Sequence, residues 1–242
     1  KTIINEKAMC FIMLEKQLPY KYKVYDVIKK DILCGSYSPG DVLNERALSG
    51  QMGISRTPIR EALQMLAQDG WVQLETYKGA VVREYDLRYL QEISRIRMAL
   101  EVCAIEDAAA NITNNDIAEL EEIQNKQTGM IQALKQQGLE SFDVLAFIFL
   151  DRSFHCHIYD LSHNRELIHL LRNYYDLFQL MGTQAVMNTV ERKTETLQEH
   201  QMILDTLKRR DIPAAVQAMR THMEITEKNM RSHMRQKRSP TG

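Results

Sequence analysis

The sequence has little of several features that mark particular classes of protein. Its 242 residues include four cysteines at wide, irregular spacing and no CxxC pair, which indicates free thiols in a reducing compartment. The longest apolar runs, Ala8–Leu14 and Val144–Leu150, are far shorter than the ~20 residues that a membrane helix needs. The net charge is only −1, so the whole chain has no general attraction to a polyanion. We therefore expect an ordinary globular protein of the cytoplasm with no membrane partner.

Glycine and proline are scarce in the later part of the chain. Most of the ten glycines and five prolines lie before residue 80, and from Asp86 onward the spacing of apolar residues is helical. This change predicts a domain boundary at residues 84–87. We expect an extension over residues 1–20, a first domain over 21–85, a second domain over 86–236 and a tail over 237–242.

The first domain is expected to contain three helices and a hairpin. Apolar spacing and capping residues predict helices over residues 22–34, 44–53 and 55–69, with a loop over 35–43. Asn44 and Ser55 are suited to cap the second and third helices. Two short apolar strands then flank a turn at Tyr77–Gly79. This order of elements is typical of a helix-turn-helix followed by a wing.

The second domain is expected to be an all-α bundle. Helical periodicity predicts six helices, over residues 86–110, 114–137, 141–161, 164–189, 193–209 and 211–236. The residues suited to cap these helices are Asp86, Thr113, Ser141, Asn164 and Asp211. The predicted fold class is therefore mainly α, a winged helix-turn-helix joined to an all-α helical bundle.

Two arginines, Arg56 and Arg60, stand in the first turns of the helix that follows Ser55. The helix macrodipole is positive there and disfavours cations. One explanation is that this helix end faces DNA, because the second helix of a helix-turn-helix meets phosphates and base edges in the major groove. The alternative is a small helical domain whose arginines are merely solvated.

A longer pattern covers most of the first domain. Its parts are I..G...PG..L.E..L over Ile32–Leu48, G.SRTP.REAL..L...G over Gly53–Gly70, and G..V over Gly79–Val82. This pattern resembles the winged helix-turn-helix of the GntR superfamily of bacterial transcription regulators. The resemblance implies that the chain contacts DNA at Arg46, Ser55, Arg56, Thr57, Arg60, Lys78 and Gly79.

Four side chains that can bind a metal are expected to point into the bundle. Asp151 and His155 are four residues apart on the apolar face of one helix, while His200 and His222 lie on the apolar stripes of two others. A buried carboxylate and imidazole are costly unless they are paired or bind a cation. The set suits zinc, nickel, cobalt, iron or manganese. The alternative is a buried Asp–His pair with two hydrogen-bonded core histidines.

Three stretches of the second domain, over residues 86–101, 149–167 and 199–224, resemble the FCD effector domain of the FadR-type branch of the same superfamily. In the metal-binding members of that branch the ligands are one Asp and three His. The matching positions here are Asp151, His155, His200 and His222. The resemblance therefore implies a divalent metal ion, with zinc or nickel as the first candidates and manganese or iron as the next.

Arg97 lies between Ile93 and Leu100 on the inward stripe of the first bundle helix. The residues alone leave two possibilities open, a buried salt bridge with Glu101 or Asp151, or a bidentate grip on the carboxylate of a ligand. The resemblance matches Arg97 to an arginine that lines the family's effector pocket. It implies a small organic acid bound between Arg97 and the metal ion.

These observations predict a ligand-responsive bacterial DNA-binding transcription regulator and not an enzyme. A homodimer is expected to bind the two half-sites of a roughly palindromic operator, and a small carboxylate effector to shift the arrangement of the DNA-binding domains. An alternative is a metal-dependent enzyme, because a three-His, one-Asp metal with open positions can activate water. A purely structural metal and a sensor of the metal itself also stay open.

Overall fold

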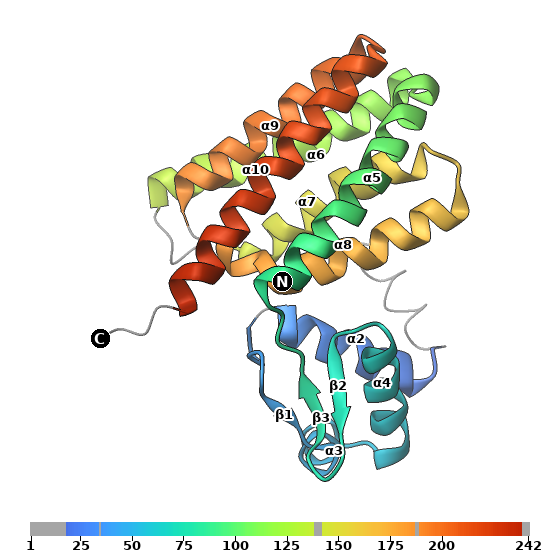
Figure 1. Ribbon diagram of the computed structural model, residues 1–242, viewed down its shortest axis with the longest axis vertical. Helices are drawn as coiled ribbons and strands as arrows, with labels where there is room; N and C mark the ends of the chain where they lie inside the picture. The colour runs from blue at the N-terminus through green and yellow to red at the C-terminus, as the bar shows by residue number, and fades with distance from the viewer. Residues whose placement is uncertain (1–17, 34, 138–141, 187–188, 239–242) are drawn as a thin grey trace, which may run out of the picture. The chain divides into compact units, whose positions relative to one another are not determined.

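The computed structural model describes residues 18–33, 35–137, 142–186 and 189–238, and the chain divides into two compact units, Lys1–Glu84 and Tyr85–Gly242 (Figure 1). Most of the expected extension, the expected cap Ser141 and the end of the expected tail lie outside the described residues. Within the described ranges, no helix combines the length and the apolar character that crossing a membrane requires.

The first unit contains three described helices and a small sheet. Its elements are α2 (Tyr20–Leu33), β1 (Val42–Leu43), α3 (Glu45–Met52), α4 (Arg56–Gln68), β2 (Val72–Glu75) and β3 (Gly79–Val82). The buried face of α4 carries Ile59, Ala62, Leu63 and Leu66 at helical spacing, and α4 packs against α2. This packing fixes α4 in the unit and leaves Arg56 and Thr57 at its start exposed.

The sheet has three antiparallel strands in the order β1-β3-β2. The hairpin of β2 and β3 is as predicted, with Glu75 paired to Gly79 across the turn. The prediction of a loop over residues 35–43 was wrong at its end, because Val42 and Leu43 pair with Val81 and Ala80 of β3. A strand of two residues is too short to show alternation in the sequence, so only the tertiary pairing reveals it.

The caps of α3 and α4 differ from each other. The Asn44 side chain accepts hydrogen bonds from the backbone amides of Arg46 and Ala47 at 2.9 and 3.1 Å, as expected, and Gly53 ends α3 with a φ of 66°. Ser55 has the extended backbone of an N-cap residue, but its side chain makes no capping hydrogen bond. Ser55 thus stands at the N-cap position, as expected, but does not cap α4 through its side chain, and its residue is exposed.

The second unit consists of six helices in the part of the chain that the structure describes. They are α5 (Leu87–Asn111), α6 (Asn114–Gln137), α7 (Val144–Asp160), α8 (Arg165–Val186), α9 (Val190–Lys208) and α10 (Ile212–Arg238). Asp86 caps α5 as predicted. Asp143 caps α7, with Oδ1 2.9 Å from the Ala146 amide, and α9 begins earlier than expected because Thr189 caps it.

The main core of the second unit lies between α5, α6, α7, α9 and α10. Its members include Ile105 of α5, Phe154 of α7, Ile203 of α9 and Met219 of α10, all fully buried. The helices run alongside one another as a bundle (Figure 1). Helices α7, α9 and α10 therefore present their inner faces to a common interior, which is where the predicted metal ligands lie.

Candidate metal centre and DNA-binding surface

The predicted DNA-contacting residues are all exposed in the structure. They lie at the start of α3, at the start of α4 and in the turn between β2 and β3: Arg46, Ser55, Arg56, Thr57, Arg60, Lys78 and Gly79. The structure therefore leaves each of these side chains or backbone groups accessible. Tyr77, which is not among the predicted contacts, is also fully exposed in this turn and has a φ of 71°.

Arg56 and Arg60 have a partner within the protein. The Glu45 carboxylate of α3 accepts two hydrogen bonds from Arg60, at 2.9 and 3.0 Å, and one from Arg56 at 3.2 Å. Hydrogen bonds from Arg60 are the main reason that the pKa of Glu45 is lowered. Glu45 thus offsets the unfavourable position of both cations in the first turns of α4. The outward faces of the two guanidinium groups remain exposed.

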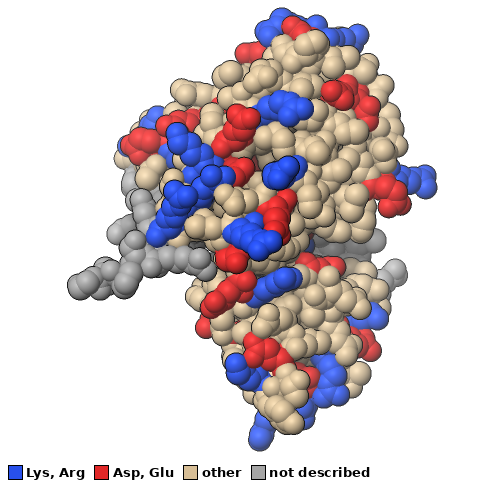
Figure 2. Space-filling view, in the orientation of Figure 1, with Lys and Arg blue, Asp and Glu red and all other residues tan. Residues whose placement is uncertain are grey.

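The turn between the strands has a similar local pair, in which Lys78 Nζ lies 2.9 Å from the Glu75 carboxylate. On the face that Figure 2 shows, basic and acidic side chains are interspersed over the first unit. Basic side chains at the start of α4 and in the turn thus each stand beside an acidic partner, Glu45 or Glu75.

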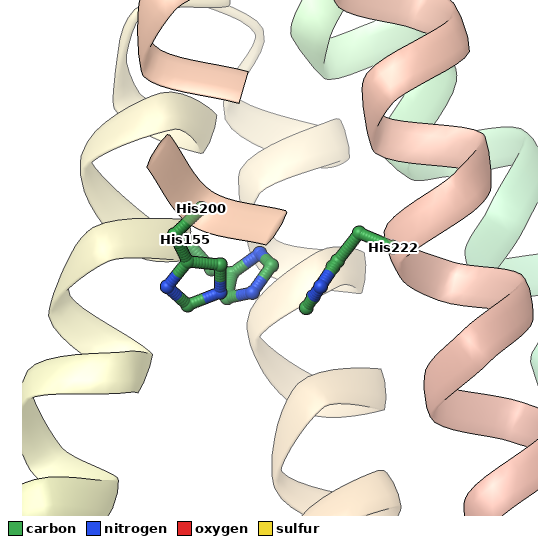
Figure 3. A group of neighbouring side chains, drawn as sticks. All are labelled: His155, His200 and His222. Carbon is green, nitrogen blue, oxygen red and sulfur yellow. The ribbon is translucent and has the colours of Figure 1, made fainter. Parts of the chain in front are cut away.

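Three of the four predicted metal ligands meet in the interior of the bundle. His155 of α7, His200 of α9 and His222 of α10 each offer a ring nitrogen, and these atoms all lie within 4.8 Å of one another. Figure 3 shows the three imidazole rings gathered between their helices. All three side chains are buried, with exposures of 1%, 0% and 4%.

His200 is the least satisfied member of this cluster. Neither of its ring nitrogens has a hydrogen-bond partner, although both are buried. Its ring stacks on that of Phe154, with the two ring centroids 4.3 Å apart. Burial, followed by the neighbouring His222 and His155, holds the pKa of His200 well below its ordinary value. A neutral imidazole keeps a lone pair, and buried nitrogens without partners are what a bound metal ion would satisfy. The residues present therefore fit a metal ion.

Asp151, the fourth predicted ligand, lies beside the cluster. Its Oδ1 is 3.7 Å from His200 Nε2, and its Oδ2 accepts a hydrogen bond of 2.5 Å from the Tyr175 hydroxyl. The carboxylate is thus oriented by Tyr175 with one oxygen toward the histidines. The sequence did not identify Tyr175, because its contact with Asp151 crosses from α8 to α7.

Arg97 is buried and forms an ion pair with Glu101. The distance between Arg97 Nη2 and Glu101 Oε1 is 2.9 Å, and the guanidinium also lies over the rings of Tyr175 and Phe178. The Tyr159 hydroxyl donates to the same Glu101 oxygen at 2.5 Å, while Glu101 Oε2 is 3.8 Å from His155 Nδ1. This salt bridge is one of the two possibilities that the sequence left open for Arg97.

Sequence reasoning also missed a carboxylate directly behind the cluster. Glu199 Oε2 is 2.7 Å from Nδ1 of His222, and both side chains are buried. Burial lowers the pKa of His222, and Glu199 opposes this effect. The only signal in the sequence is that Glu199 precedes His200, and nothing in that spacing pairs it with a residue of α10.

The family comparisons agree with this architecture. The gntR family of bacterial regulatory proteins matches residues 21–82, and the FCD domain family matches residues 92–225. A helix-turn-helix with a small sheet followed by a helical FCD domain defines a bacterial DNA-binding transcription regulator. The chain belongs to the GntR family, in its FadR-type branch. The families that match are regulators and not enzymes, so the alternative of a metal-dependent enzyme is set aside.

Individual relatives extend the likeness over both units. The chain is 31% identical over 211 residues to the "Uncharacterized HTH-type transcriptional regulator YdhC" of Bacillus subtilis (strain 168), which covers 86% of this chain and 90% of that protein. It is 27% identical over 216 residues to the "HTH-type transcriptional repressor RspR" of Escherichia coli (strain K12), covering 88% and 90%. The solved structure of E. coli McbR/YncC has a TM-score of 0.75 at 25% identity and covers 91% of this chain and 99% of that chain.

Proposed function

We propose that the second unit binds one divalent metal ion through Asp151, His155, His200 and His222. The observation that carries this proposal is the group of three buried ring nitrogens within 4.8 Å of one another, together with the unpartnered nitrogens of His200. Imidazole and carboxylate ligands suit zinc and nickel first, and manganese or iron next. When bound, the ion would supply a positive charge and open coordination positions in the interior of the bundle.

The metal-loaded unit is further proposed to bind a small organic acid at Arg97. Because Arg97 already holds the Glu101 carboxylate, an incoming carboxylate would have to replace Glu101 on the guanidinium. The guanidinium would keep one carboxylate partner, while the displaced Glu101 carboxylate would stay in the interior beside His155, so the positive charge of the bound metal ion would have to offset the added negative charge. The buried hydroxyl of Ser94, which has no hydrogen-bond partner and lies one turn before Arg97, supports a polar ligand in this place.

On the DNA side, residues 21–85 are proposed as the DNA-binding domain and residues 86–236 as the effector-binding and dimerisation domain. The contacts to a roughly palindromic operator would come from the exposed set Arg46, Ser55, Arg56, Thr57, Arg60, Lys78 and Gly79. A homodimer in the cytoplasm would bring two such sets to two half-sites. The effector changes DNA affinity only as far as it binds the two arrangements of the dimer unequally.

A second candidate is a regulator for which the metal ion itself is the signal. The ion pair between Arg97 and Glu101 favours this candidate, because Arg97 is satisfied without any ligand. In that case Glu101 takes the place that an effector acid would otherwise fill.

One experiment separates these possibilities. Fluorescence anisotropy measures the affinity for duplex DNA from upstream of the encoding gene, using metal-free protein, zinc- or nickel-loaded protein, and loaded protein with a panel of small carboxylic acids. The effector proposal expects at least one acid to change the affinity severalfold. It also expects Arg97→Lys to lose that response, while the control Arg95→Lys, on the exposed side of the same helix, keeps it.

Other results would decide against the effector proposal. A response to the metal alone, unchanged by every acid, would identify a metal sensor. A metal that raises thermal stability and leaves DNA affinity unaltered would identify a structural ion. Loaded protein that ignores duplex DNA even at low salt would overturn the proposed contacts.

A further inference from the structure

The three histidines of the cluster differ in what stands behind their rings. His222 has the Glu199 carboxylate 2.7 Å from its Nδ1, a distance that only a hydrogen bond explains. His155 Nδ1 is 3.8 Å from Glu101 and has no hydrogen-bond partner, and His200 has none at either nitrogen. His222 is therefore the ring that a carboxylate orients through a direct hydrogen bond.

A carboxylate can only accept a hydrogen bond, so Nδ1 of His222 must be the donor. In the neutral ring the other nitrogen, Nε2, then carries the lone pair. This is the tautomer that a metal ligand needs if Nε2 faces the cluster. The hydrogen bond also fixes the plane of the ring, and it makes the imidazole a stronger electron donor.

Glu199 is itself held in place. Arg192 Nη1 is 2.5 Å from Oε1 of Glu199, and Arg192 Nη2 is 3.1 Å from Oε2, so the two charges form a bidentate pair. Arg192 Nη2 also donates to Thr226 Oγ1 of α10 at 3.4 Å. Both members of the pair are buried, with Arg192 7% and Glu199 8% exposed. The pair thus joins α9 to α10 on the side of α10 that carries His222.

We propose that Glu199 is a positioning residue for the metal site, which sets the tautomer and orientation of His222, and that Arg192 anchors Glu199 in that role. This inference rests on the proposed metal function of the cluster. In other metalloproteins, removing an outer carboxylate of this kind lowers the affinity for the metal by roughly 10–100-fold. An ion pair that only links α9 to α10 would instead contribute to folding and leave the affinity for metal unchanged.

The test is a zinc titration of metal-free full-length protein in competition with a chelating dye. We expect Glu199→Gln to weaken zinc binding by roughly 10–100-fold. The matched control is Glu195→Gln, because Glu195 also contacts Arg192, at 3.4 Å, but its side chain is 58% exposed and lies one turn away from the cluster. The control is expected to bind zinc as the wild type does. The absorption spectrum of bound cobalt gives a second readout, which should change for Glu199→Gln alone.

The outcomes separate the inference from the proposed function. Wild-type protein that binds none of zinc, nickel, manganese and iron overturns the metal proposal, and this inference falls with it. Wild-type binding that Glu199→Gln leaves unaltered overturns the positioning role alone. If the variant does not fold, ¹⁵N NMR of histidine-labelled wild-type protein without metal still decides the matter. A proton on Nδ1 of His222 supports the inference, and a proton on Nε2 contradicts it.

Discussion

The buried ion pair of Arg97 and Glu101 allows a quantitative prediction. Burial by itself would raise the pKa of Glu101, but Arg97, His155 and Tyr159 outweigh it and lower the pKa from 4.5 to about 2. At about 1.4 kcal/mol per pKa unit, this difference corresponds to roughly 3 kcal/mol of folding free energy. Removing one partner of a buried pair costs about 3–5 kcal/mol in other proteins, which is the same order.

The perturbation is Glu101→Gln in metal-free protein, measured by calorimetry or circular dichroism at neutral pH. The glutamine keeps the size of the side chain but leaves the buried guanidinium of Arg97 without its counter-charge. For a domain of about this size, each kcal/mol lowers Tm by roughly 2–4 °C, so a loss of 3 kcal/mol predicts a fall of about 6–12 °C.

The control is Glu92→Gln on the same helix. Glu92 forms the same i, i+4 pair with Arg88, but those side chains are 57% and 86% exposed. A surface pair of this kind contributes only about 0.3–0.5 kcal/mol, so Tm should fall by 2 °C at most, by the same conversion. Equal losses in the two variants would refute the argument that burial makes the inner pair stabilising.

The stability that the ion pair of Arg97 and Glu101 contributes should fall at acidic pH. The folded-state pKa of Glu101 is depressed, so its stabilising contribution is fully present above the unfolded value of 4.5 and is lost as the pH falls toward about 2. The difference in Tm between wild type and Glu101→Gln should therefore be constant from pH 7 to 5 and should narrow below pH 4.5. A difference that grows on acidification would contradict the assigned direction of the pKa.

Three further predictions concern the DNA-binding surface and the cluster. Arg60→Ala should lower operator affinity and reduce the slope of log affinity against log salt by about 0.9, in anisotropy titrations at several salt concentrations; an unchanged slope would mean that Arg60 contacts no phosphate. Glu45→Gln removes the carboxylate that pairs with Arg56 and Arg60, so the affinity for a random-sequence duplex should rise severalfold at low salt. A lower affinity would show instead that Glu45 orients the two arginines toward the DNA. His200→Phe keeps the ring stacked on Phe154 and removes two buried nitrogens that have no hydrogen-bond partner, so Tm without metal should rise. The rise in Tm that zinc causes in the wild type should disappear in this variant, and a rise that persists would exclude His200 as a ligand.

The elements that the sequence predicted correctly are those with local causes. The helices of the bundle followed from a repeat of apolar residues within each segment, and the start of α5 followed from the capping side chain of Asp86. The inward direction of His155, His200 and His222 followed from the same repeat, because each histidine lies on an apolar stripe. Local periodicity determines which face of a helix is buried, so it also brings these side chains to the interior.

The features that the sequence did not reveal depend on contacts between elements. Glu45 pairs with arginines eleven and fifteen residues later, and Glu199 pairs with a histidine of the next helix. Their partners are set by how neighbouring helices pack, which a pattern within one helix does not encode. The second strand partner of β3 escaped prediction for the same reason, since the pairing of Val42 and Leu43 is tertiary.

Anomalous X-ray diffraction can show whether the histidine cluster binds a divalent metal ion. Crystals of protein purified without added metal, and of zinc- or nickel-loaded protein, would be measured above and below the absorption edge of the metal. If the metal proposal is right, we expect one strong peak in the bundle at about 2.0–2.2 Å from nitrogens of His155, His200 and His222 and from an oxygen of Asp151. Loaded crystals with no peak there, or with peaks only at surface histidines, would contradict it.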